Sequence, residues 1–280
     1  MKNIGIIGLG LIGGSLGLAL TNKNYKVYGF DNNDLHSKKA VELGLVCDIL
    51  SIDEMLNICE VIFVATPTRV SLNIIKKLLN KVKPNQVVID VGSTKMLICN
   101  ELLSVKNRKN YVAAHPIAGT ENSGPTAAIH DLFLNKKLVI CDKEESSNSA
   151  LTSAIEIFLA LNCSIVFMNS DEHDKHLAYI SHLSHVCSFA LGLTVLDIEK
   201  DEKNIFNLAG SGFSSTARLA KSSPAMWESI LIQNKTNLLP AIDEYIKHLN
   251  NLKIAIEKED SESLLKNMIK ANEIRTIIKN

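Results

Sequence analysis

The first half of the chain alternates short β-branched runs with segments whose apolar residues recur at helical spacing. The predicted strands lie at residues 4–7, 26–30, 61–65, 87–91, 111–114, 137–141 and 164–168. The predicted helices lie between them, at residues 11–22, 35–43, 70–81, 95–105 and 148–161. Several strands are apolar at every position, which is typical of strands covered on both faces. The alternation therefore predicts an α/β fold with a doubly wound, mostly parallel sheet.

Strand character is lost after residue 168, and helical patterns continue to the end of the chain. Residues 210–215 form a Gly/Ser-rich break, and Pro224 suits the first turn of another helix. That helix is predicted to run toward Glu257, with Pro240 as a candidate kink, and a last helix runs to Lys279. We therefore predict an α/β domain over residues 1–168 and an all-helical domain over residues 169–280.

The composition is that of a globular protein of about two domains. Of 280 residues, 46% are hydrophobic, and 30 basic side chains balance 30 acidic ones. Zero net charge argues against a nucleic-acid-binding protein. The uncharged stretch between Lys2 and Lys23 mimics a signal peptide, but six of the first twenty residues are glycine, which favours a strand, a turn and a helix start. We therefore expect a cytoplasmic protein with no membrane span.

The six cysteines offer no metal or redox motif. No two of them are closer than twelve residues, so the chain contains no C-x-x-C pair. Most stand beside apolar neighbours, and we expect buried free thiols. They are Cys47, Cys59, Cys99, Cys141, Cys163 and Cys187.

A glycine-rich turn links the first predicted strand to the first predicted helix. Its sequence, Gly8-Leu9-Gly10-Leu11-Ile12-Gly13, has the G-x-G-x-x-G spacing in the strand–turn–helix context that this pattern requires. The first glycine permits the tight turn, the second lets the backbone approach a pyrophosphate, and the third lets the helix pack close to the strand. The free N–H groups of the helix start attract the anion. We therefore predict that Gly8, Gly10, Leu11, Ile12 and Gly13 bind a dinucleotide.

The second predicted strand is followed by Asp31, 21 residues beyond Gly10. A carboxylate at this place accepts hydrogen bonds from a ribose 2′-hydroxyl and repels a 2′-phosphate. Asn32 and Asn33 come next, with no arginine to hold such a phosphate. The sequence therefore favours NAD over NADP.

Two more turns end neighbouring strands at the carboxyl edge of the predicted sheet, where open α/β sheets bind their ligands. Thr66 and Pro67 follow one strand, and the run Asp90-Val91-Gly92-Ser93-Thr94-Lys95 ends the next. We expect Thr66 and Pro67 to contact the cofactor and Ser93 to face its nicotinamide end. A simple cap between strand and helix is the alternative for the second turn.

A dense polar run, His115-Pro116-Ile117-Ala118-Gly119-Thr120-Glu121-Asn122-Ser123-Gly124, follows a further apolar strand. Pro116 restricts His115 to an extended conformation, which helps to fix the ring. A histidine close to a nicotinamide suits general-base work on an alcohol, because its ordinary pKa lies near 6.5. The alternative is a histidine that only caps a turn.

Together these segments resemble the prephenate dehydrogenase family. The resemblance rests on G-L-G-L-I-G-G-S, D-V-G-S-T-K, H-P-I-A-G-T-E-N-S-G, S-H-L-S-H and A-R-L-A-K-S-S-P-A-M-W, in this order. It spans nearly the whole chain and implies a Rossmann domain followed by an all-α dimerisation domain. It also implies a homodimeric enzyme that oxidises prephenate with NAD, without a metal, to CO2 and 4-hydroxyphenylpyruvate on the route to tyrosine.

The resemblance implies a role for each candidate residue. His115 would be the base on the ring hydroxyl of the substrate, and Ser93 would orient that hydroxyl and His115. Arg218 would bind a substrate carboxylate. The residues that would line or gate the pocket are Thr120, Glu121, His182, His185 and Trp227.

Arg218 also stands out by its residue type. Only four of the 30 basic residues are arginine. We therefore expect each arginine to stand where the planar guanidinium group, with its paired N–H donors, is needed. Bidentate capture of a carboxylate fits this place, and a structural ion pair is the alternative. The chain departs nearby from the family pattern, with Ser184 where proline is common, Ser211 where glycine is common, and Ser214-Ser215 in place of a basic–acidic pair. The last departure removes a candidate ionic partner of Glu121 and leaves the gating of the pocket open.

Several alternatives stay open. No residue separates prephenate from arogenate, which carries an amine in place of the side-chain keto group, and tyrosine feedback is equally undetermined. A β-hydroxyacid dehydrogenase would use a lysine such as Lys221 but would leave the His115 segment unexplained. A nicotinamide-sensing regulator without turnover would need a DNA-binding module or a basic face. Two histidine pairs have helical spacing, His173/His176 and His182/His185, and we expect them to line the pocket or a dimer interface. A zinc site is the alternative, which the absence of a cysteine partner and of an H-E-x-x-H pattern disfavours.

Overall fold

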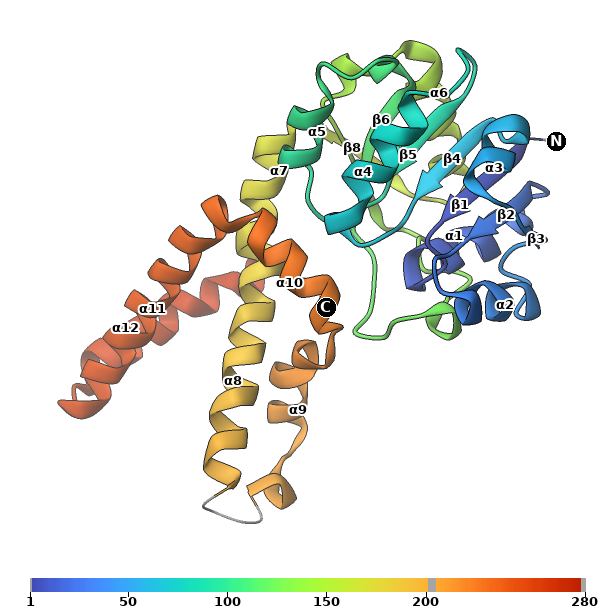
Figure 1. Cartoon of the computed structure of the whole chain (residues 1–280). Helices are drawn as coiled ribbons and strands as arrows, with labels where there is room; N and C mark the ends of the chain where they lie inside the picture. The colour runs from blue at the N-terminus through green and yellow to red at the C-terminus, as the bar shows by residue number, and fades with distance from the viewer. Residues whose placement is uncertain (1, 201–204, 278–280) are drawn as a thin grey trace. The chain divides into compact units, whose positions relative to one another are not determined.

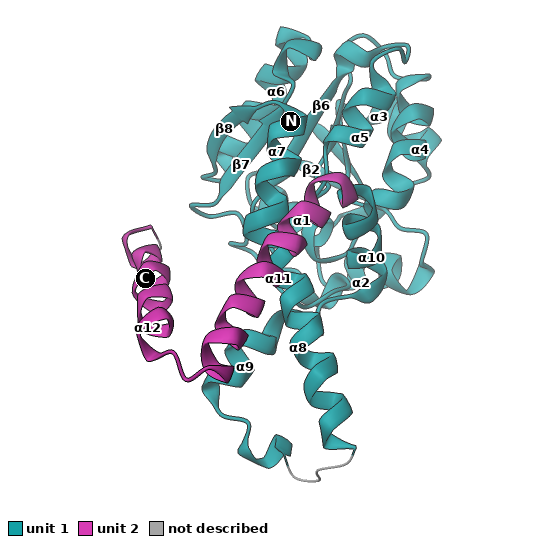
Figure 2. Ribbon diagram, turned by 90° about the vertical axis from the view of Figure 1, so that its left-hand side faces the viewer, with its two compact units in different colours: residues 1–234 teal, residues 235–280 magenta. Residues whose placement is uncertain are grey.

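The computed structural model describes residues 2–200 and 205–277 (Figure 1). By its internal contacts the chain divides into two compact units, Met1–Asn234 and Lys235–Asn280 (Figure 2). The end predicted for the last helix, Lys279, lies outside the described residues. The predicted domain boundary between residues 168 and 169 falls inside the first unit and stays a prediction.

The first unit is built on one eight-stranded sheet with the strand order β3-β2-β1-β4-β5-β6-β7-β8. All neighbouring strands are parallel except β6 and β7, which confirms the predicted doubly wound, mostly parallel sheet. The strands are β1 (Asn3–Ile7), β2 (Lys26–Phe30), β3 (Asp48–Ile49), β4 (Val61–Val64), β5 (Val87–Asp90), β6 (Tyr111–Pro116), β7 (Lys137–Cys141) and β8 (Ser164–Met168).

Helices cover both faces of this sheet (Figure 1). One apolar core lies between the sheet and α1, α2 and α6, and a second lies between the sheet and α3, α4 and α5. Because both faces are covered, every residue of β4, β5 and β6 is buried, as their continuous apolar runs predict. These helices are α1 (Leu11–Thr21), α2 (Asp34–Glu42), α3 (Ile52–Ile58), α4 (Thr68–Leu79), α5 (Met96–Leu102) and α6 (Asn148–Ala160).

Strand β3 and helix α3 were not predicted. Strand β3 has only two residues, too few to show any alternation of polar and apolar side chains. Helix α3 follows it and begins with a capping box, in which the Ser51 hydroxyl accepts from the Glu54 backbone N–H and the Glu54 carboxylate accepts from the Ser51 backbone N–H. That S-x-x-E pattern is a helix-start signal in the sequence and could have revealed α3.

The described residues of the first unit after β8 are mostly helical, as predicted. They include α7 (Ser170–Leu177), a π-helical turn (Ala178–His182), α8 (Leu183–Glu199), α9 (Ser211–Ala217) and α10 (Pro224–Gln233). The predicted break at residues 210–215 is wrong for the most part, because Gly210 is the N-cap of α9 and the serines that follow are helical. Pro224 occupies the first turn of α10, as expected.

The second unit consists of α11 (Lys235–Glu257), α12 (Ser261–Ala271) and a 3₁₀ turn at Asn272–Thr276. The helical pattern after Pro224 is interrupted at Asn234, between α10 and α11, and not at the predicted Pro240. Pro240 lies inside α11, five residues after its first residue, and does not end the helix. The interruption at Asn234 has a tertiary cause, since the buried Asn234 side chain bonds to the Asp174 carbonyl and the His182 ring.

Helix α7, the π-helical turn and α8 form one continuous helix, Ser170–Glu199. Among the described residues it is the one helix whose length and composition would suffice to cross a membrane. Its first half carries His173, Asp174 and His182, all of them buried polar side chains of the first unit. The length and composition of this helix therefore do not by themselves identify it as a membrane span.

Candidate active site

The glycine loop has the shape that a dinucleotide requires. Gly8 adopts a φ of +93°, which L side chains rarely adopt, and a Cβ on Gly13 would lie 1.8 Å from the Gly8 carbonyl oxygen. Gly10 caps α1 without any side-chain hydrogen bond, and a Cβ there would meet no atom within 4 Å. The loop thus leaves free N–H groups facing open space at a helix start, which fits a pyrophosphate.

Asp31 follows β2 and holds this loop. Its carboxylate accepts from the Leu9 backbone N–H at 2.8 Å and from the Asn33 backbone N–H at 2.9 Å, and His36 Nδ1 lies 3.7 Å away. Asp31 also lines the cleft beside the loop. A ribose hydroxyl bound there would therefore meet a carboxylate that the backbone already orients.

A single cleft of about 1640 Å³ brings most of the predicted residues together. It is larger than the roughly 300–1,000 Å³ of an ordinary ligand pocket, so it has room for a cofactor beside a substrate. The predicted residues that line it are Gly10, Leu11, Ile12, Asp31, Thr66, Pro67, Ser93, His115, Thr120, His182, His185, Arg218 and Trp227. Three predicted residues are not on its wall, namely Gly8, Gly13 and Glu121.

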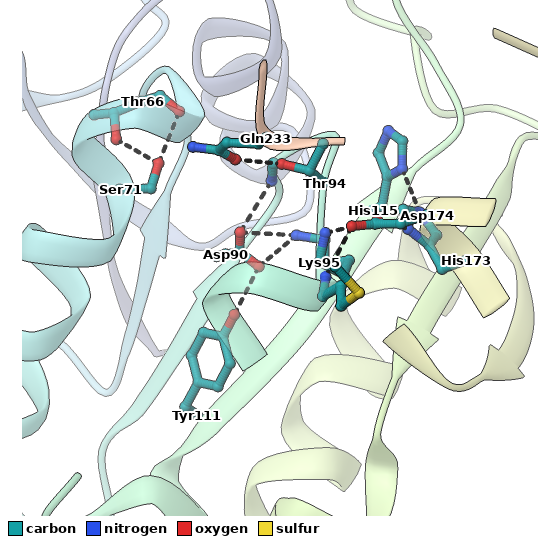
Figure 3. A network of polar contacts seen from close by, with 12 residues as sticks. Thr66, Ser71, Asp90, Thr94, Lys95, Tyr111, His115, His173, Asp174 and Gln233 are labelled. Atoms are coloured by element: carbon teal, nitrogen blue, oxygen red, sulfur yellow. Dashed lines mark hydrogen bonds and ion pairs between the residues drawn. The ribbon is translucent and has the colours of Figure 1, made fainter. Parts of the chain in front are cut away.

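His115 stands near the end of β6 and is buried. Its Nδ1 lies 2.8 Å from Nε2 of His173, and Nδ1 of His173 lies 2.7 Å from Oδ1 of Asp174 (Figure 3). Burial, followed by the nearby His173, Lys95 and His182, holds the pKa of His115 well below its usual value. The ring is therefore neutral at neutral pH, as a base must be before it accepts a proton.

The turn after β5 is fixed by a fully buried ion pair. Lys95 Nζ lies 2.7 Å from Oδ2 of Asp90, and the Tyr111 hydroxyl donates to Oδ1 at 3.0 Å (Figure 3). The Thr94 hydroxyl donates a hydrogen bond to Oε1 of Gln233 at 2.6 Å. Helix α5 has no side-chain cap from its own N-cap residue, which disfavours the alternative of a simple local cap. Ser93 is left on the cleft wall.

Helix α5 is capped from a distant part of the chain. The carboxylate of Asp174 accepts from the backbone N–H of Lys95 at 2.8 Å and of Met96 at 2.9 Å. The same carboxylate contacts His173, which contacts His115. The sequence predicted His173 as a pocket-lining or dimer-interface histidine, with a zinc ligand as the alternative, and assigned no role to Asp174. The adjacent His-Asp pair at a predicted helix start was the only available signal.

Arg218 and Glu121 form an ion pair, with Nη1 of Arg218 2.6 Å from Oε2 of Glu121. Glu121 therefore has a cationic partner even though Ser214 and Ser215 replace the family's charged pair. Its own backbone N–H and then Arg218 lower the pKa of Glu121. The Arg218 side chain is 51% exposed, so the pair contributes little to stability.

Three aromatic rings form the adjoining wall of the cleft. The His185 ring stacks on the Trp227 ring with a centroid distance of 3.4 Å, and the His182 ring meets Trp227 edge-on at 5.8 Å. Burial lowers the pKa of His182 to about 4 and also lowers the pKa of His185. The two histidine rings are therefore neutral at neutral pH.

The cysteines form no disulfide, and the histidine pairs form no metal site among the described residues. None of the six cysteines forms a disulfide, and four are buried as expected, but Cys47 is exposed and Cys187 is half-buried. Cys47 comes just before the two-residue edge strand β3, which leaves its side chain uncovered. Within residues 2–200 and 205–277, no three His, Cys, Asp or Glu side chains gather as a metal site would need.

The fold and the cleft define a class of protein. Three features are typical of a nucleotide-dependent dehydrogenase. They are a glycine turn between a strand and a helix, a carboxylate after the second strand, and a buried neutral histidine on the wall of the same cleft. Family models describe the chain more narrowly. Residues 16–167 match the nucleotide-binding domain of prephenate dehydrogenase, and residues 169–270 match its dimerization domain.

Individual relatives agree. Prephenate dehydrogenase of Bacillus subtilis is 30% identical over 96% of this chain and 74% of its own. Cyclohexadienyl dehydrogenase of Zymomonas mobilis is 28% identical over 99% of this chain and 96% of its own. A crystal structure of Aquifex aeolicus prephenate dehydrogenase with hydroxyphenyl propionate and NAD+ has a TM-score of 0.90 and 31% identity, covering 100% of this chain and 99% of that one. The chain belongs to the prephenate dehydrogenase family, which confirms the resemblance and makes it an oxidoreductase.

Proposed function

We propose that this chain catalyses the NAD-dependent oxidative decarboxylation of prephenate to 4-hydroxyphenylpyruvate in tyrosine biosynthesis, with His115 as the base. The observation that carries the proposal is the placement of His115, a buried neutral histidine on the wall of the cleft that the glycine loop also lines. The open space beside Gly10 and the carboxylate of Asp31 support NAD as the cofactor.

The reaction needs a base, a group that orients the substrate hydroxyl and a group that binds a substrate carboxylate. Bound NAD supplies the hydride acceptor for the ring carbon that carries the hydroxyl. As that carbon loses hydride, its oxygen must lose a proton, and Nε2 of His115 accepts it because Nδ1 already bonds to His173. Ser93 orients the hydroxyl, and Arg218 holds a carboxylate of the substrate. Loss of the ring carboxylate as CO2 makes the ring aromatic and drives the step, so the protein mainly positions the reactants.

Absorbance at 340 nm tests this function directly. The purified chain is incubated with NAD and either prephenate or arogenate, each with and without tyrosine. NADH formation with prephenate is expected. Formation with arogenate alone would replace the proposed substrate, and formation with neither would refute the proposed activity.

Dual specificity for prephenate and arogenate is the second candidate function. The similarity to cyclohexadienyl dehydrogenase of Zymomonas mobilis favours it. Two alternatives lose their basis because the chain belongs to the prephenate dehydrogenase family. They are a regulator without turnover and a β-hydroxyacid dehydrogenase that uses Lys221. Cytoplasmic localisation and the absence of nucleic-acid partners stay predictions.

Asp31→Ala is expected to erode the preference for NAD over NADP. The variant loses a hydrogen-bonded carboxylate at the ribose and the repulsion of a 2′-phosphate, so kcat/KM for NAD should fall by about 10-fold or more. Steady-state rates with both nucleotides measure the ratio. Asp34→Ala, an exposed neighbour outside the cleft wall, is the matched control. A wild-type enzyme that already prefers NADP would contradict the assignment.

Arg218→Ala is expected to raise KM for prephenate about 10–100-fold, because a charge-assisted bidentate hydrogen bond contributes roughly 1.5–3 kcal/mol. KM for NAD should stay within a few-fold. Arg218→Lys should recover only part of the loss, since an ammonium keeps the charge but not the fork. Arg275→Ala, an exposed arginine of the second unit, serves as control. An unchanged KM with a sharply lower Tm would make Arg218 a purely structural residue.

We further infer that the chain is a homodimer. The model that matches residues 169–270 describes a dimerization domain. Helix α8 exposes large apolar side chains, with Leu193 64% and Leu196 53% accessible, and α12 in the second unit exposes Leu265 to 60%. Such surfaces are typical of subunit interfaces. Sedimentation at assay concentration should give a dimer, and a fully active monomer would count against it.

A further inference from the structure

Asp174 connects the two buried histidines of the cleft, His115 and His182. Asp174 is 1% exposed and lies on α7, one residue after His173. Its side chain is hydrogen-bonded to His173, which is hydrogen-bonded to His115. Its backbone carbonyl is hydrogen-bonded to Asn234, which is hydrogen-bonded to His182. All four of its neighbours in this network are buried. Hydrogen bonds among such groups leave few choices for where each proton sits.

The side-chain branch sets the proton of His115. Both carboxylate oxygens of Asp174 accept backbone N–H groups, and an ionised carboxylate can only accept. His173 therefore donates to it through Nδ1–H, across 2.7 Å. When His173 carries a single ring proton, that proton lies on Nδ1, and the bare Nε2 accepts from Nδ1–H of His115 across 2.8 Å. The proton of His115 thus lies on Nδ1, and Nε2 is left with a free lone pair.

The backbone branch sets the proton of His182 in the opposite way. The Asp174 carbonyl can only accept, so the Asn234 atom that faces it at 2.7 Å is the amide nitrogen Nδ2. The second hydrogen of this amide points to Nδ1 of His182, 3.0 Å away. Nδ1 of His182 is thus the acceptor, and the proton of the neutral ring lies on Nε2.

We propose that Asp174, acting through His173 and Asn234, fixes opposite tautomers on the two cleft histidines, so that His115 accepts through Nε2 while His182 donates through Nε2–H. Burial keeps both rings neutral at neutral pH, with the pKa of His182 lowered to about 4 and that of His115 lowered well below its usual value. Only neutral rings have tautomers to choose between. Asp174, His173 and Asn234 are positioning residues in this arrangement.

The catalytic meaning of the arrangement rests on the proposed function. A base must present a lone pair to the substrate hydroxyl, and a group that binds a carboxylate or carbonyl must present an N–H. The cleft wall offers both a lone pair and an N–H, because His115 and His182 each line it. With the tautomers exchanged, His115 would meet the hydroxyl with an N–H and could not accept its proton.

The tautomers can be measured on the ligand-free, wild-type protein. ¹⁵N-histidine labelling and long-range ¹H–¹⁵N NMR spectra near pH 7 distinguish protonated from bare ring nitrogens. His115→Asn and His182→Asn assign the two rings by the signals that they remove. The expected result is Nδ1–H on His115 and Nε2–H on His182. A proton on Nε2 of His115 or on Nδ1 of His182 would overturn the proposal.

Variants test each branch separately. In His173→Leu, His115 loses its acceptor, so its proton should move to Nε2 while the signals of His182 stay in place. In Asn234→Ala, only the signals of His182 should change. His176→Leu removes an exposed histidine from the same helix and should change neither ring. If His173→Leu leaves the His115 tautomer as it was, His173 does not set it.

Turnover gives the second readout. His173→Leu should lower kcat about 10²-fold, within the range that a misdirected base loses, with KM for NAD unchanged. His173→Gln should recover much of this loss, because its side-chain carbonyl can accept from Nδ1–H of His115. A purely structural role would lower Tm in both variants without this recovery of kcat. If wild type turns over neither prephenate nor arogenate, the proposed function fails, while the NMR result on the tautomers still stands or falls by itself.

Discussion

Replacing His115 with asparagine should lower kcat about 10²–10⁴-fold, the usual contribution of general-base catalysis. Asparagine keeps a polar side chain of similar reach but cannot accept a proton. The affinity for NAD should barely change, because in the proposed site the glycine loop and Asp31, and not this ring, hold the nucleotide. Steady-state kinetics and a binding titration with NAD measure the two effects. A variant that keeps most of its turnover would remove His115 from the role of base.

The pH profile of the wild type gives an independent check on His115. Burial lowers its pKa, and the groups facing it from neighbouring elements, His173, Lys95 and His182, act in the same direction. A lowered pKa means that the neutral, active ring persists as the pH falls below the ordinary histidine value near 6.5. We therefore expect kcat/KM to hold its plateau below that value and His115→Asn to lose the acid limb. An acid limb centred at or above pH 6.5 would contradict a buried base.

Lys95→Met is expected to destabilise the fold by about 3–5 kcal/mol, because it leaves Asp90 as a buried charge without its partner. The Lys95 and Asp90 side chains are 0% and 2% exposed, so water cannot compensate for the lost ammonium. Urea denaturation measures the free energy of unfolding. Lys76→Met is the matched control, since its ion pair with Glu101, 2.7 Å long, lies at the surface and should contribute about 1 kcal/mol or less.

A combined variant separates the loss of the charge pair from the loss of packing. Lys95→Met, Asp90→Leu and Tyr111→Phe together remove the ion pair and the hydroxyl bonded to it, so no unpaired buried charge remains. Apolar replacement of a whole buried pair is often close to neutral. The combined variant should therefore be more stable than Lys95→Met alone. Equal or greater destabilisation would show that the pair contributes through packing and not through charge.

The sheet and the cofactor loop could be predicted because their signals are local. Strands such as β4 and β6 consist of apolar runs of strand length, and the alternation with helices restricts how such strands can be arranged. The signal of the glycine loop is equally local, since the clash at Gly13 arises within the same turn, although a Cβ on Gly8 would meet Ala65 at the end of β4. The boundaries of most of these elements were predicted to within two residues, whereas β3 and α3 were missed because the strand is too short to show a pattern.

The sequence by itself determined the α/β class, the dinucleotide loop, the place of Asp31 and the candidate base, because each depends on residues that are neighbours in the chain. Only the tertiary structure decided how these groups are held. His115 meets His173 across 58 positions, Asp174 caps α5 across 79, and Arg218 meets Glu121 across 97. Such pairs leave no period or motif in a single sequence, because their geometry follows from how the sheet and the later helices pack. The protonation of the cleft therefore depends on long-range packing, whereas the fold class follows from local pattern.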